Sequence, residues 1–186
     1  MAGLSEATSS AQKTDIAPRE RILRAARELF YARGVKAVSV DEIAAAAHTN
    51  KMTLYRHFTS KDLLVAEYLR SLSQKYDAVW DEVARTHPGD PLAQLRALLC
   101  RFGEYLACTE NRGCAFANAA VEIPEKDHPA RAVIEEHKTR QRAQLARLCR
   151  EAGFVEPSRW RTRFFSSSKG HESTSRALAD AVPAPN

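Results

Sequence analysis

The strongest constraint on the fold is a succession of short helical segments with tight breaks in residues 18–58. The first helix is predicted to begin near Pro18, because proline is tolerated in the first turn, and to stop at Gly34. The apolar face of this helix is formed at helical spacing by Ile22, Ala26, Leu29 and Phe30. Three of its arginines lie mostly off that face: Arg19, Arg24 and Arg27.

Ser39 and Glu42 form the pattern of a capping box, which marks the start of the second helix. In this arrangement the Ser39 hydroxyl accepts from the Glu42 amide, while the Glu42 carboxylate reaches back to the cap. Ile43 and the four alanines of residues 44–47 follow. The second helix is therefore expected to be short, and its small side chains let another helix approach closely.

Residues 48–49 are predicted to form a turn, and Asn50 is predicted to be the N-cap of a third helix over residues 51–58. Leu54 and Phe58 are four residues apart, so both are expected to face inward and to hold the third helix against the first two. Three short helices with a tight turn between the second and the third describe a helix-turn-helix.

The rest of the chain reads as further helices, with no strand pattern longer than four residues. These helices are predicted over residues 61–86, 91–107, 114–121 and 129–151. The predicted fold class is all-α. The predicted divisions are a disordered tail at 1–17, the helix-turn-helix domain at 18–64, a larger helical domain at 65–156 and an irregular tail at 157–186.

Positive charge is concentrated near the N-terminus. Residues 18–61 hold nine Lys and Arg and four Asp and Glu, a net charge of +5, whereas residues 62–156 have a net charge of −2. A basic module on a slightly acidic body indicates a polyanionic partner. No apolar run is long enough to span a membrane and no secretory signal is recognised, so we expect a cytoplasmic protein without a membrane partner. Four cysteines in such a chain argue against a disulfide framework.

The third predicted helix carries the side chains that reading DNA requires. A recognition helix enters the major groove and presents hydrogen-bond donors to base edges from its first turns. Tyr55, His57 and Lys61 can alternatively donate to phosphates, which position a protein without reading sequence. Taken singly, such residues are usually a solvated face, so the interpretation depends on the ordered set. The donors on the helix are Lys51, Thr53, Tyr55, Arg56 and His57.

Residues 18–66 resemble the DNA-binding region of the TetR (tetracycline-repressor) family. The main match is Thr53-Leu54-Tyr55-Arg56-His57-Phe58-Thr59-Ser60-Lys61-Asp62-Leu63-Leu64. It is accompanied by Ala-Arg-Glu-Leu-Phe at residues 26–30, by Gly34, and by Ser39 followed by Ile43-Ala44. This combination is far more specific than a single short motif. The remaining helices resemble the family's ligand-binding and dimerisation domain in layout.

The resemblance implies a homodimeric transcriptional regulator, in the first instance a repressor, that binds a near-palindromic operator. By motif position, Ser39 and Lys61 would contact phosphates and Lys51 is the first choice for reading a base. The rest of the DNA-facing set is Thr49, Met52, Thr53, Tyr55, Arg56 and His57. Two departures stand out: His48 and Thr49 occupy a turn that is usually small and apolar, and Met52, which could touch a thymine methyl, replaces a small residue.

The resemblance also implies that residues 65–156 bind a small-molecule effector that releases the protein from its operator. The candidate lining residues are Tyr76, Trp80, Phe102, Tyr105, Cys108 and Phe116. The alternative is that aromatic residues at helical spacing are ordinary core. Cys108 and Cys114 are predicted to be buried small side chains in preference to a redox sensor. No metal-ligand spacing, phosphate-binding loop or nucleophile motif is recognised, so we predict no cofactor, metal site, catalytic residue or enzyme activity.

Residues 157–186 depart from the pattern of the chain, with six serines, three prolines and almost no helical periodicity. The family normally ends with two long apolar helices that pair with a second subunit. A reading frame shifted by one base would give five successive apolar codons from Arg163 to Ser168 if the serines use TCN codons. We hypothesise a frameshift near residues 155–159, which would leave the effector domain incomplete. The alternative to a frameshift is a genuine divergent tail. The alternative to a working regulator is a truncated or frameshifted, non-regulating remnant with impaired dimerisation and weak non-specific DNA binding.

Overall fold

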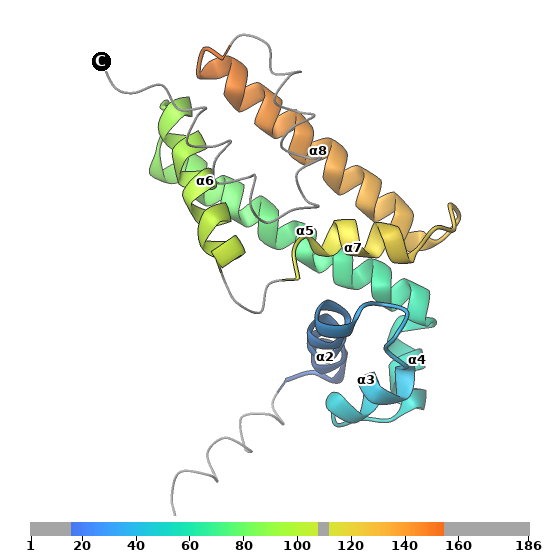
Figure 1. Ribbon diagram of the computed structural model, residues 1–186. Helices are drawn as coiled ribbons and strands as arrows, with labels where there is room; N and C mark the ends of the chain where they lie inside the picture. Colours follow the sequence, from blue (N-terminus) through green and yellow to red (C-terminus); the bar gives the residue numbers. More distant parts are fainter. Residues whose placement is uncertain (1–15, 108–111, 155–186) are drawn as a thin grey trace, which may run out of the picture. The chain divides into compact units, whose positions relative to one another are not determined.

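The computed structural model describes residues 16–107 and 112–154 (Figure 1). This part of the chain forms seven helices and no strand, which confirms the all-α prediction. None of these helices has the length and apolar character needed to cross a membrane. The helices are α2 (Pro18–Arg33), α3 (Val40–Ala46), α4 (Lys51–Phe58), α5 (Lys61–Thr86), α6 (Pro91–Ala107), α7 (Ala115–Glu122) and α8 (Pro129–Glu151). The predicted tail at 157–186 and the hypothesised frameshift lie outside the described residues.

The helix ends follow from local side-chain chemistry. Gly34 ends α2 with φ +88°, in the left-handed region that favours glycine. The capping box of α3 is present, with Ser39 and Glu42 in the predicted roles. The Asn50 side chain caps α4 by accepting from the Thr53 amide at 2.8 Å. These predicted boundaries are therefore confirmed.

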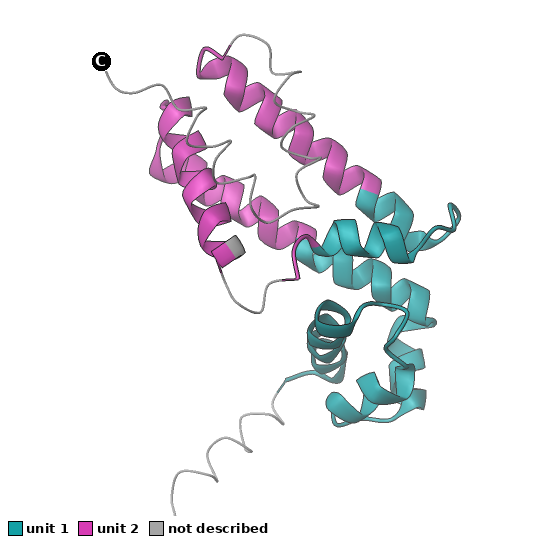
Figure 2. Ribbon diagram, viewed as in Figure 1, with its two compact units in different colours: residues 1–72, 115–134 teal, residues 73–114, 135–186 magenta. Residues whose placement is uncertain are grey.

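The chain divides into two compact units (Figure 2). Unit 1 consists of residues 1–72 and 115–134, and unit 2 consists of residues 73–114 and 135–186. Two long helices, α5 and α8, each have residues in both units. Unit 1 thus contains α7 in addition to the three short helices. The predicted functional boundary between residues 64 and 65 falls inside α5.

The core of unit 1 holds α4 against its neighbours. Leu54 and Phe58 are 0% and 5% exposed, so the prediction that both face inward is confirmed. Burying a side chain of this size stabilises the fold by about 1.5–3 kcal/mol. The Arg19 guanidinium of α2 lies 5.1 Å from the Phe58 ring centre and pairs with Glu67 of α5 at 2.8 Å. Apolar burial and these polar contacts together fix the orientation of α4 within unit 1.

A contact distant in sequence joins α7 to the turn between α2 and α3. The backbone N–H of Lys36 donates to the Glu122 carboxylate at 3.0 Å. The same carboxylate lies so close to Gly34 that a Cβ there would be 2.6 Å from Oε1. Glycine at this position is therefore favoured by the positive φ, and any larger residue would also require the Glu122 carboxylate to shift.

Candidate nucleic-acid interface

The face of α4 opposite its buried residues carries long, mostly polar side chains. Met52 is 83% exposed and Tyr55 is 38% exposed, and Lys51 and Arg56 are also exposed. Thr53 and His57 are partly buried, as are Thr49 before the helix and Lys61 after it. Because Leu54 and Phe58 hold the opposite face, this surface is preorganised on a rigid helix. It offers donors for base edges and phosphates and one flexible apolar side chain.

His57 is less available than its neighbours. Its Nε2 atom is buried and has no hydrogen-bond partner within the described part of the chain. In this conformation His57 can reach a nucleic acid only through its other ring nitrogen, Nδ1.

Ser39 is already engaged by the capping box. Its hydroxyl donates to Glu42 Oε2 at 2.8 Å and accepts from the Glu42 amide at 3.2 Å. The backbone N–H of Ser39 also donates to Glu42, which lowers the pKa of that carboxyl to about 2, together with the Ser39 hydroxyl and Arg33. A phosphate contact from the Ser39 hydroxyl would require its proton to turn away from Glu42.

The predicted base-reading residue has a partner that sequence reasoning missed. Lys51 Nζ lies 3.3 Å from Asp41 Oδ2, and the two side chains are 54% and 71% exposed. Asp41 belongs to the first turn of α3 and Lys51 to the first turn of α4. The available sequence signal was an acidic residue beside the capping box and ten residues before Lys51. We call these two residues the Asp41–Lys51 pair.

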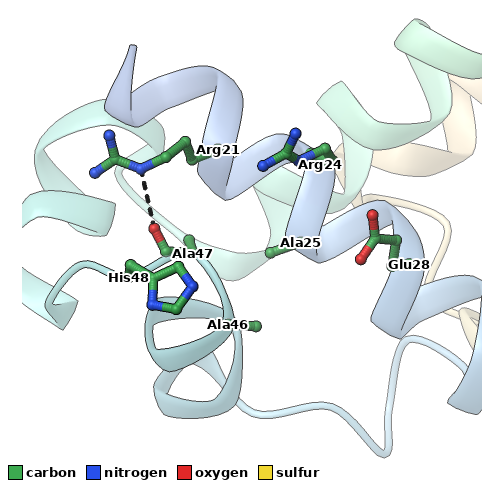
Figure 3. A pocket seen from close by; sticks show the side chains of 7 residues that line it. All are labelled: Arg21, Arg24, Ala25, Glu28, Ala46, Ala47 and His48. Carbon is green, nitrogen blue, oxygen red and sulfur yellow. Dashed lines mark hydrogen bonds between the residues drawn. The ribbon is translucent and has the colours of Figure 1, made fainter. Parts of the chain in front are cut away.

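A hollow of about 320 Å³ lies between α2 and the turn after α3 (Figure 3). Arg21 lines it and is held by two carbonyls, with Nε donating to Ala47 O at 3.1 Å and Nη1 to Ile16 O at 2.9 Å. Arg24 and His48 also line the hollow, and Glu28 supplies the opposing charge. Sequence reasoning counted both arginines in the basic module and gave neither a site.

His48, in the turn between α3 and α4, adopts a positive φ. Its φ is +51°, in the left-handed region that glycine adopts most readily and that His adopts more often than most other non-glycine residues. The turn between α3 and α4 thus places an exposed His48 side chain at a left-handed backbone position.

Two of the predicted effector residues contact α8 in unit 2. The Tyr76 ring centre lies 5.3 Å from that of His137. Trp80 Nε1 donates to Gln141 Oε1 at 2.6 Å. Both aromatic side chains are partly buried and anchored to polar residues, so they do not belong to a purely apolar core.

The other predicted effector residues are dispersed. Phe102 and Tyr105 lie on α6 in unit 2, where the Tyr105 hydroxyl donates to Gly113 O at 3.1 Å. Phe116 is 1% exposed in unit 1, and Cys108 lies outside the described residues. None of the six lines the hollow beside Arg21, and none lines a second hollow of unit 1, of about 470 Å³, which Lys36, Lys61 and Glu122 help to form.

The prediction that Cys114 is buried is wrong, because the break before α7 leaves it exposed. Cys149 is partly buried, and burial raises the pKa of its thiol.

A polar network joins α5 to α8 within unit 2. Arg140 donates to Ser73 Oγ at 2.6 Å and pairs with Asp77 at 3.1 Å. Ser73 Oγ lies 2.9 Å from His137 Nδ1, which fits a neutral imidazole accepting the serine proton. Burial, followed by the positive charge of Arg140, lowers the pKa of His137 to about 4. His137 is therefore a neutral structural residue at pH 7.

The chain matches two family models. The model described as "Bacterial regulatory proteins, tetR family" matches residues 22–68, and the one described as "Tetracyclin repressor-like, C-terminal domain" matches residues 91–154. The chain is 34% identical over 94 residues to the transcriptional regulator AcrR of Shigella flexneri, covering 50% of this chain and 44% of that protein. It is 30% identical over 129 residues to the regulator TtgR of Pseudomonas putida, covering 64% of this chain and 60% of that protein. The matches thus span about half the length of these relatives.

Solved structures agree with these matches. A putative TetR transcriptional regulator of Streptomyces avermitilis is 25% identical, with a TM-score of 0.69 and 89% of each chain covered. A TetR-family transcriptional regulator of Streptomyces coelicolor is also 25% identical, with a TM-score of 0.68, covering 87% of this chain and 96% of that one.

Proposed function

Because this chain belongs to the tetR family of bacterial regulatory proteins, we propose that it is a transcriptional regulator that reads operator DNA with α4. The observation that carries the proposal is the two-sided character of α4. Leu54 and Phe58 anchor one face in the core, while Lys51, Met52, Tyr55 and Arg56 are exposed on the helix. A rigid helix with exposed donors at its first turn is what insertion into the major groove requires.

Each side chain has a proposed part in DNA binding. Lys51 reads a base, and Met52 contacts a thymine methyl. Ser39 and Lys61 contact phosphates, as does Arg24 at the hollow beside the turn. The remaining contacts come from Thr49, Thr53, Tyr55, Arg56 and His57. The protein binds as a homodimer, whose two α4 helices enter successive major grooves about 34 Å apart.

The regulator acts as a repressor that a small molecule releases from DNA. Of the six candidates, Tyr76, Trp80, Phe102 and Tyr105, all in unit 2, are proposed to line the effector site. The polar anchors of Tyr76 and Trp80 on α8 favour a ligand with both aromatic and polar groups. Such a regulator works in the cytoplasm, where its operator lies, and no catalytic step is part of the proposal. The remnant alternative is not favoured, because the second family model matches residues 91–154.

Fluorescence anisotropy with the full chain tests the proposal. Duplexes from the region upstream of the gene are compared with scrambled duplexes at two salt concentrations. A regulator should bind an upstream duplex with a Kd of about 10⁻⁸ M and prefer it over the scrambled one. A Kd of about 10⁻⁵ M, equal on both duplexes and steeply dependent on salt, would refute specific regulation and leave only the remnant reading.

A further inference from the structure

We propose that Asp41 is a specificity-determining residue that acts through Lys51, so that the Asp41–Lys51 pair reads one G·C base pair. The inference rests on the proposed DNA-binding function and adds a residue to it. Asp41 is favourably placed in the first turn of α3, and on the exposed surface of the module it pairs with Lys51.

The position of the pair is set by the caps of two helices. Asp41 follows the Ser39 cap of α3, and Lys51 follows the Asn50 cap of α4. Both caps make backbone hydrogen bonds, so the two first turns are held in place. The Asp41 carboxylate and the Lys51 ammonium are therefore brought within 3.3 Å by the fold while remaining largely exposed.

The neighbouring acid, Glu42, does not share this role. Its carboxylate accepts from the Ser39 backbone and hydroxyl and from Arg33 at 2.6 Å. The charge of Glu42 is thus already paired with Arg33 and hydrogen-bonded to Ser39. Asp41 is 71% exposed and pairs with Lys51, the residue proposed to read a base.

The pair has consequences for non-specific binding. An unrestrained lysine is a flexible point charge that binds any phosphate. Asp41 competes with phosphates for the Lys51 ammonium, and its own charge repels the DNA backbone. Exposed ion pairs are weak, so base contacts can still draw both side chains to the DNA.

The pair also has a matching base pair. Lysine donates to the O6 and N7 acceptors of guanine, and aspartate accepts from the N4 amino group of cytosine. In a G·C pair these groups lie side by side on the major-groove edge. A donor and an acceptor held 3.3 Å apart can address both partners of one G·C pair.

The test uses the full chain with Asp41→Asn, and Asp81→Asn as the matched control. Asp81 is an exposed residue of α5 in unit 2, so its substitution makes the same change in charge away from α3 and α4. A duplex that wild type selects from a random pool is compared with a scrambled duplex. Asp41→Asn should lower the ratio of specific to non-specific affinity about five-fold or more, the lower end of what one base contact contributes. It should also steepen the salt dependence on scrambled DNA by about one counterion.

Two further measurements separate positioning from simple charge. In a Lys51→Ala background, Asp41→Asn should no longer steepen the salt dependence, because no ammonium is released. One G·C pair of the selected duplex should lose its effect on affinity in Asp41→Asn when it is replaced by A·T. As a control for folding, the Tm of Asp41→Asn should fall by no more than about 4 °C, since Asp41 is not the cap and a first-turn acid contributes only weakly to helix stability.

Asp41→Asn behaving like Asp81→Asn would overturn the inference while leaving DNA binding intact. A steeper salt dependence that persists without Lys51 would overturn the positioning role. A wild-type chain that selects no duplex would overturn the proposed function, and this inference with it.

Discussion

Replacing Gly34 with Ala should destabilise the protein by about 2–3 kcal/mol, through two separable effects. The first is backbone strain, because φ at Gly34 is +88° and an alanine there costs about 1 kcal/mol or slightly more. The second is the loss of a hydrogen bond. The new Cβ would lie 2.6 Å from Glu122 Oε1, so the carboxylate must withdraw from the Lys36 N–H, at a cost of about 1–2 kcal/mol.

A matched variant and a double-mutant cycle isolate these effects. Gly89 also has a positive φ, +72°, but a Cβ there would have no atom within 4 Å. Gly89→Ala should therefore lower the free energy of unfolding only by the backbone strain of about 1 kcal/mol. In a Glu122→Ala background, Gly34→Ala should likewise fall to about 1 kcal/mol, because the hydrogen bond is already absent. The cycle should therefore show a coupling of about 1–2 kcal/mol.

Urea unfolding at constant m-value measures each variant. For a chain of this length, a loss of about 3 kcal/mol also corresponds to a fall in Tm of roughly 6–12 °C. Equal costs of Gly34→Ala with and without Glu122 would refute the reasoning, since the α7 carboxylate would then not occupy the space beside Gly34. A Gly89→Ala variant as damaging as Gly34→Ala would refute it in the same way.

Three other substitutions test the core, the buried histidine and the basic hollow. Leu54→Ala should cost about 2–5 kcal/mol in urea unfolding, whereas Met52→Ala on the same helix should stay within about 0.5 kcal/mol; similar losses would contradict the two-sided assignment of α4. The pKa of His137 is about 4 in the folded protein and about 6.5 for an unperturbed histidine, so the unfolded chain binds the extra proton between these pH values and acid favours unfolding. His137→Gln should therefore lose less stability than wild type as pH falls from 6.5 to 4. If its free energy of unfolding fell with pH as steeply as that of wild type, the lowered pKa of His137 would be contradicted. Arg24→Ala should reduce the salt dependence of binding by about one counterion on selected and scrambled DNA alike; an effect confined to one sequence would argue against a phosphate contact.

Local signals explain why the short helices could be predicted. Pro18, Gly34 and the caps at Ser39 and Asn50 act through their own backbone and the next few residues. The burial of Leu54 and Phe58 follows from helical spacing, because a surface helix buries one face. Each of these effects acts between residues only a few positions apart, so both partners can be recognised in one short stretch of sequence.

Several contacts that sequence reasoning missed join residues far apart in the chain. Glu122 lies 86 residues after Lys36, whose N–H it accepts. Arg140 and Ser73 are 67 residues apart. Helical periodicity indicates which face of α7 or α8 is polar, but it does not identify the residue opposite. Phe116 illustrates this limit, because its aromatic side chain suggested an effector pocket and the structure buries it in the core of unit 1.

Asp41 and Glu42 show how adjacent residues of one type acquire different roles. Both are acids in the first turn of α3. Glu42 turns back to Ser39 and Arg33, and its lowered pKa reflects bonds that stabilise the helix start. Asp41 is one residue earlier, and a rotation of about 100° around the helix carries it to the first turn of α4 instead. The capping box therefore does more than start a helix. By engaging one acid it leaves the other beside Lys51, where an acidic group influences which DNA sequences the basic module accepts.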